Sequence, residues 1–140
     1  MPEKKTLERA REDAREGKAP STQAGEFVKE EMDHIREGKH GARSPQQAIA
    51  IGLSKARRAG VPLPPPKAGQ TTERTRRQAE RDSAKGQSGN AKKKPSAKRS
   101  RAVLNALKRE GQGAASHQAL SKQAHRAARQ RKKSSAGGAA

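Results

Sequence analysis

Residues 24–60 contain two amphipathic stretches separated by a short loop, and this pattern limits the possible folds more than any other feature of the chain. In the first stretch the apolar residues recur at spacings of three and four, as Ala24, Phe27, Val28, Met32 and Ile35. In the second stretch they are Ala48, Ile49, Gly52, Leu53 and Ala56. Such spacing lines up apolar side chains on one face of an α-helix. The sequence therefore predicts two helices, each with one face to bury.

Both predicted helices are bounded by residues that begin or end a helix. Gly38 follows the first apolar stripe, and glycine accepts the left-handed turn that ends a helix. Ser44 and Pro45 suit the N-cap and the first position of the second helix, and Gln47 can complete a capping box. Gly60 follows the second stripe and ends it. A loop of about six residues favours an antiparallel pair, so we predict a small helical hairpin.

The remainder of the chain is poor in residues that could fill a core. Of 140 residues, 29% are hydrophobic, 1% are aromatic and 34% are charged. A chain of this kind buries too little apolar surface to offset the entropy lost on ordering. We therefore predict an all-α protein that is ordered only in part, with five segments. They are a solvated N-terminal helix over 1–20, which could pack as a third helix; the helical hairpin over 21–60; a proline-rich and then basic disordered linker over 61–97; a basic, weak second helical pair over 98–133; and a disordered tail over 134–140.

The positive charge is distributed unevenly along the chain. The net charge is +19, yet residues 1–40 carry nine Lys and Arg against ten Asp and Glu. Residues 41–140 carry 24 Lys and Arg against four acidic residues. A chain with so one-sided an excess of cations seeks polyanions, so we expect a nucleic acid as its partner. No stretch is apolar enough for a membrane span, and a signal-peptide core is missing from the first residues.

The basic segments predict how a nucleic acid is bound. The run KKKPSAKRSR at 92–101 is similar in composition to the tails of linker-histone-type proteins, and such runs bind by neutralising phosphates. With one Phe and no Trp or Tyr, stacking on bases is not an option. We therefore expect phosphate contacts to a sequence-tolerant partner, with DNA favoured over RNA. The candidate contact residues are Lys39, Arg43, Lys55, Arg57, Arg58, Lys92, Lys93, Lys94, Lys98, Arg99, Arg101, Lys122, Arg126, Arg129 and Lys133.

No constellation of residues in the sequence predicts an enzyme. The chain has no Cys, so thiol catalysis and disulfides are excluded. Glu31 and His34 stand at i and i+3, which is half of a carboxylate-bridged metal site, but the sequence offers no second copy from a facing helix. We therefore predict no catalytic residues, no metal and no cofactor.

Three stretches resemble a family of small uncharacterised bacterial proteins. They are residues 26–31, residues 34–44 and residues 47–60, which follow the signature GKHGARSxxQAIAIxLSxARxAG. The segment ALKRE at 106–110, with the basic helix after it, is similar to longer members of the family. The resemblance implies a bacterial source and one hairpin domain with a basic extension. It implies no activity.

Two functional hypotheses follow from the sequence. The first is a non-enzymatic DNA-binding protein, cytoplasmic and nucleoid-associated, that acts through phosphate contacts. The second is a largely disordered, stress-related or adaptor protein whose hairpin at 24–59 binds a protein partner or a second copy of the chain.

Overall fold

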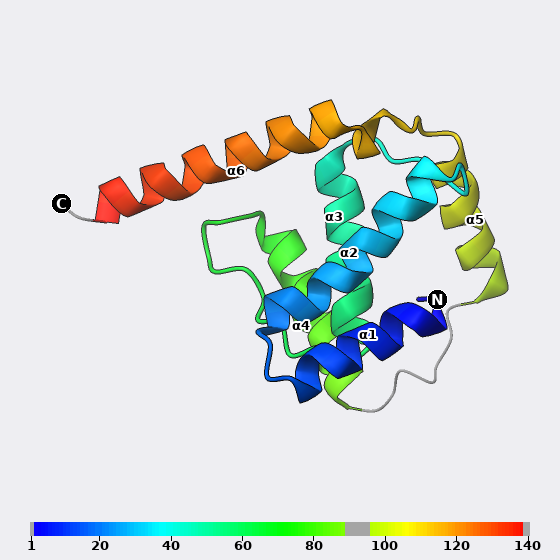
Figure 1. The fold of residues 1–140 in the computed structure, drawn as a ribbon, viewed down its shortest axis with the longest axis horizontal. Helices are drawn as coiled ribbons and strands as arrows, with labels where there is room; N and C mark the ends of the chain where they lie inside the picture. Colours follow the sequence, from blue (N-terminus) through cyan, green and yellow to red (C-terminus); the bar gives the residue numbers. More distant parts are fainter. Residues whose placement is uncertain (1, 89–95, 139–140) are drawn as a thin grey trace.

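The computed structural model describes residues 2–88 and 96–138, and in these residues the chain forms six α-helices, one short 3-10 turn and no strand (Figure 1). The predicted all-α class is therefore confirmed. None of these helices combines the length and the apolar character that crossing a membrane requires. The elements are α1 (Lys4–Arg15), α2 (Pro20–Arg36), α3 (Pro45–Arg58), α4 (Glu73–Gln87), α5 (Ala97–Lys108), the 3-10 turn η2 (Gly113–Ala115) and α6 (His117–Gly138).

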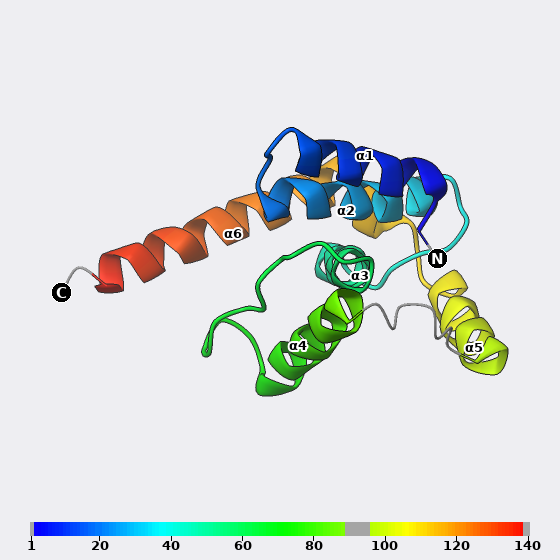
Figure 2. The ribbon, with the colours of Figure 1, turned by 90° about the horizontal axis from the view of Figure 1, so that it is seen from below.

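The first four helices are stacked in the order α1, α2, α3, α4, with α3 between α2 and α4 (Figure 2). The two helices predicted over 24–60 are present as α2 and α3. They meet at Gly52, where a Cβ atom would lie 2.7 Å from Cα of Val28, so only glycine allows this approach. Gly38 (φ +78°) and Gly60 (φ +100°) end the two helices in the left-handed conformation, as predicted.

The start of α3 is capped as the sequence predicts. The N–H of Gln47 donates to Oγ of Ser44 at 3.2 Å. The side-chain oxygen of Gln47 in turn accepts from the N–H of Arg43 at 2.6 Å, one residue before the N-cap. These contacts satisfy donors that a helix start leaves free, and they fix the direction in which the chain enters α3.

Two apolar clusters lie along the α2–α3 interface, and other parts of the chain cover each of them. One cluster is covered by α1 and the residues after α3; it comprises Ala10, Ala24, Phe27, Ala56 and Val61, with Leu7, Leu53 and Leu63 packed against it. The other is covered by η2 and the start of α6; it comprises Met32, Ile35, Ala42, Ala48, Ala114 and Ala115, with Val28, Ile49 and Leu120 packed against it. The N-terminal helix therefore packs as a third helix, an arrangement that the sequence left open.

Within the segment expected to be a linker, residues 73–87 form α4, which covers almost all of the stretch 72–84 where the sequence also allowed a transient helix. Thr72 caps this helix by accepting the N–H of Thr75 at 3.2 Å. Its apolar contribution is small: Ala79 is buried at 5% exposure. The packing on α3 is largely polar, with Oγ of Ser54 donating to Asp82 at 2.7 Å. The rest of the predicted linker, residues 89–95, lies outside the described residues.

The C-terminal helices do not form the predicted pair. No residue of α5 is buried, and α6 begins at η2, away from α5, and projects from the other helices (Figure 1). Ser116 caps α6 by accepting the N–H of Ala119 at 3.1 Å. The helix continues to Gly138, beyond residue 133 where the sequence analysis placed its end.

Candidate nucleic-acid interface

The loop between α2 and α3 is bound by a segment about seventy positions later in the sequence. The N–H of Gly41 donates to the carbonyl of Leu107 at 2.8 Å, and the N–H of Ala42 donates to the carbonyl of Gly111 at 3.1 Å. A Cβ atom at Gly41 would lie 2.0 Å from the carbonyl oxygen of Glu110, so the contact requires glycine. This docking places the end of α5 and the start of α6 beside the N-terminus of α3.

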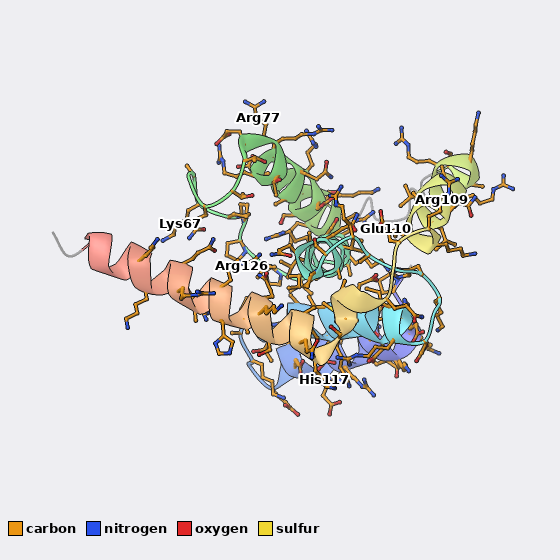
Figure 3. The ribbon with its side chains drawn as sticks, turned by 90° about the horizontal axis from the view of Figure 1, so that it is seen from above. Lys67, Arg77, Arg109, Glu110, His117 and Arg126 are labelled. Atoms are coloured by element: carbon orange, nitrogen blue, oxygen red, sulfur yellow. The ribbon has the colours of Figure 1, made fainter. Side chains whose placement is uncertain are left out.

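An open groove of about 520 Å³ lies between this loop, the connection from α5 to α6, and the first turns of α6. Figure 3 shows Glu110 and His117 along that connection, with Arg126 farther along α6. Three exposed cations from different parts of the sequence line the groove, and one carboxylate opposes them. The charged lining residues are Arg43, Lys122, Arg126 and Glu110.

The helix ends reinforce the positive character of the groove. Ser44 and Pro45, at the start of α3, line it, and α6 starts at His117 beside it. The N-terminal end of a helix carries a partial positive charge that favours anions. The groove therefore offers three cations and the N-terminus of α3 to an anionic group.

The remaining exposed candidates lie on two separate helices. Lys98, Arg99 and Arg101 are exposed on α5. Arg129 and Lys133 are exposed on α6 and continue the line that Lys122 and Arg126 begin. The candidates Lys92, Lys93 and Lys94 lie outside the described residues. The structure thus divides the predicted contact residues between α5 and the groove with α6.

The candidates on α3 are held inside the fold. Lys55 forms an ion pair with Glu31, a carboxylate that is fully buried at 0% exposure. Arg57 is buried and donates to the carbonyls of Leu63 at 3.4 Å and Pro64 at 3.0 Å. Burial lowers the pKa of Arg57, and the charge of Asp82 partly offsets this.

Two further candidates, the half-buried Arg58 and the exposed Lys39, have acidic neighbours. Nε of Arg58 lies 3.9 Å from a carboxylate oxygen of Asp82. Nζ of Lys39 lies 3.3 Å from a carboxylate oxygen of Glu37 and 3.4 Å from one of Glu3. Both contacts raise the pKa of Lys39, and the contact with Glu37 has the larger effect. We therefore leave Lys39 and the three cations of α3 out of the interface.

Sequence reasoning missed the role of Glu31, although the pattern contained a signal. Glu31 lies four residues after Phe27 and four before Ile35, so it stands on the apolar stripe of α2. A carboxylate on a buried stripe needs a partner, and both Lys55 and His40 approach it. Neither partner could be assigned before the α2–α3 packing was known.

The comparisons with known proteins concern the helix pair. Residues 19–68 match the model of a family of unknown function, DUF6496. The match spans α2, α3 and part of the proline-rich segment after them. Helices α1, α4, α5 and α6 lie outside it. No detectable similarity was found to a curated protein or to a solved structure. The expected similarity to an uncharacterised family is therefore confirmed for this part of the chain, and the family brings no activity with it.

Proposed function

We propose that this chain is a non-enzymatic, sequence-tolerant nucleic-acid-binding protein that acts through phosphate contacts. The observation that supports the proposal is the convergence of Arg43, Lys122 and Arg126 on one groove beside the N-terminus of α3. Phosphate oxygens accept hydrogen bonds from arginine, lysine and helix N-termini without regard to sequence. The partner is DNA, and the protein is a cytoplasmic, nucleoid-associated protein of a bacterium.

The line of cations on α6 extends the groove into a longer binding surface. Lys122, Arg126, Arg129 and Lys133 recur at spacings of three and four, which places them on one side of the helix. The eleven residue steps between the first and last cover about 16 Å of helix, roughly the length of five base pairs. A phosphate bound in the groove would therefore direct the backbone of the duplex along α6.

The test is the salt dependence of duplex binding, measured by fluorescence anisotropy with the full chain free of any tag. If six to ten phosphates are contacted, affinity falls about 10³- to 10⁵-fold between roughly 50 and 200 mM salt. The groove variant Arg43→Ala/Lys122→Ala/Arg126→Ala should reduce the slope of log K against log salt by roughly two to three.

The matched control removes three exposed cations from α1, as Lys4→Ala/Arg9→Ala/Arg11→Ala. This variant has the same net charge as the groove variant, so the general attraction to DNA is equal in both. We expect it to bind with a slope close to that of the unchanged protein. Equal losses in the two variants, or an affinity that salt leaves unchanged, would contradict binding through the groove.

A second candidate function, binding to a protein, is favoured by one observation on α5. Val103 and Leu104 are 56% and 40% exposed on a helix that buries no residue. Lys98, Arg101 and Lys108 flank this apolar pair, so a partner would offer an acidic surface with an apolar centre. The apolar stripe of α2 and α3, in contrast, is covered by the chain itself.

The two candidates are separated by the variant Val103→Ser/Leu104→Ser. It should leave the affinity for duplex DNA unchanged and abolish a protein complex that the unchanged chain forms. A complex that survives this change would place the protein contact elsewhere.

A further inference from the structure

A cluster of metal-ligating side chains lies where α2 meets the loop that follows it. Glu31 and His34 come from α2, and His40 comes from the loop. One potential ligand atom of each residue lies within 4.8 Å of the other two. The sequence places Glu31 and His34 on one face of α2 but does not predict that His40 lies near them. The fold of the loop supplies the third side chain.

The carboxylate of Glu31 has one oxygen with a partner and one without. Its Oε1 pairs with Nζ of Lys55. Its Oε2 is buried and has no hydrogen bond, although Nε2 of His40 lies 3.2 Å away. The other ring nitrogen of His40, Nδ1, lies 3.0 Å from the carbonyl oxygen of Gly41.

These contacts leave His40 in an arrangement that a neutral imidazole does not satisfy. Both ring nitrogens of His40 face an acceptor, the carbonyl oxygen of Gly41 and Oε2 of Glu31. A neutral imidazole has one N–H, so it can satisfy only one of the two. A cation between Nε2 of His40 and Oε2 of Glu31 would give both atoms a partner.

We propose that this cation is a divalent zinc ion held by Glu31, His34 and His40. Zinc binds histidine nitrogen at about 2.0–2.1 Å and carboxylate oxygen at about 2.0–2.2 Å, in tetrahedral geometry. Two ligand atoms on such an ion are about 3.3 Å apart, and Nε2 of His40 lies 3.2 Å from Oε2 of Glu31. The existing separation therefore fits an ion that bridges the two groups.

The surroundings of the cluster have the features of a supported metal site. Histidines that bind metals usually direct their second ring nitrogen to a carbonyl or carboxylate. His40 directs Nδ1 to Gly41, and His34 directs Nε2 to Oε1 of Glu3 at 3.1 Å. The two rings stand nearly perpendicular, at 86° with centroids 5.9 Å apart. Glu30, which is 4% exposed, adds a second buried carboxylate oxygen without a partner.

The ion would connect α2 to the loop between α2 and α3, which is hydrogen-bonded to residues 107 and 111. That loop also carries Arg43, so the metal would steady one wall of the groove. The inference rests on the cluster alone and does not depend on nucleic-acid binding. The ion would tie α2 to the loop, and water would complete its tetrahedral coordination as the fourth ligand.

The test is titration of the tag-free chain with zinc chloride by isothermal calorimetry, and with Co²⁺ by visible absorption. We expect one Zn²⁺ per chain, intense Co²⁺ bands of four-coordinate geometry, and a Tm that rises with zinc concentration. His40→Ala and His34→Asn should each weaken zinc binding by about 100-fold or more, beyond what losing an orienting partner alone usually costs. Glu3→Gln, which removes the carboxylate that faces His34 and Lys39 but no proposed ligand, should weaken zinc binding by about 10-fold.

The matched control is His117→Ala/His125→Ala, which removes two exposed histidines of α6. It should bind zinc as the unchanged chain does. His34→Asn provides the test if His40→Ala perturbs the loop, and circular dichroism reports whether each variant is folded. Failure to bind one equivalent, weak six-coordinate Co²⁺ spectra, or loss of binding in the α6 control would overturn the proposal.

Discussion

Replacing Gly41 by alanine tests the docking that creates the groove. The added Cβ would lie 2.0 Å from the carbonyl oxygen of Glu110 and 2.5 Å from that of Gly111. Backbone atoms cannot yield as the end of a flexible side chain can, so residues 107–111 must move away from the loop. We therefore expect Gly41→Ala to release this segment while α2 and α3 remain packed.

The size of the effect follows from the contacts that are lost. Two backbone hydrogen bonds, from Gly41 to Leu107 and from Ala42 to Gly111, join the loop to the segment. Each contributes about 0.5–1.5 kcal/mol, so docking should weaken by about 1–3 kcal/mol in total. This corresponds to a rise of roughly 5- to 150-fold in the population of the undocked state.

Hydrogen exchange of individual amides, followed by NMR, measures this population directly. The amides of Gly41 and Ala42 should exchange faster by the same 5- to 150-fold in Gly41→Ala, and those in the middle of α2 should not change. Gly113→Ala is the matched control, because a Cβ at Gly113 meets nothing within 4 Å. Unchanged exchange at Gly41→Ala, or an equal effect in the control, would refute the docking argument.

Two other predictions concern α4, the helix that replaces a predicted disordered linker. Gly86→Ala should detach α4 from α3 and lower the urea midpoint of unfolding, because the added Cβ would lie 1.9 Å from the carbonyl oxygen of Arg57. The control is Gly25→Ala on the exposed side of α2, where the added Cβ meets nothing within 4 Å. This control should stabilise the fold by about 0.5–1 kcal/mol. Hydrogen bonds from Arg76 lower the pKa of Glu73 below its usual 4.5. This lowered pKa favours the folded helix above about pH 4.5, and the contribution disappears as the pH falls through the folded pKa. NMR titration of the Glu73 carboxyl should show the lowered midpoint, and Arg76→Ala should raise it toward the usual 4.5. Equal midpoints in both proteins would show that Arg76 and Glu73 do not pair.

The features predicted from the sequence are those that depend on residues close together in the chain. The apolar spacing gave α2 and α3, and single residues gave their ends: Ser44 as a cap, and Gly38 and Gly60 as stops. Each of these depends on neighbours within a few positions, so one sequence is enough to recognise it.

The features that the sequence could not predict arise from contacts between distant segments. α4 is ordered through polar contacts to α3 at Asp82 and through a close backbone approach at Gly86, and neither leaves an apolar pattern. The docking on Gly41 is made by backbone groups, which every residue possesses. The predicted use of Lys55 and Arg57 at an interface did not anticipate that the fold holds both inside. A count of cations cannot separate those that pair internally from those that face a partner.

The most direct test of the central claim is a map of backbone amide shifts when a short DNA duplex is added to the labelled full chain. We predict that the largest changes fall on Arg43–Gln46 and on 116–126, the two walls of the groove, and extend along α6. Residues of α1 and α4 should change little. Changes confined to α5, or spread evenly over every exposed cation, would contradict a phosphate-binding groove built by the loop and α6.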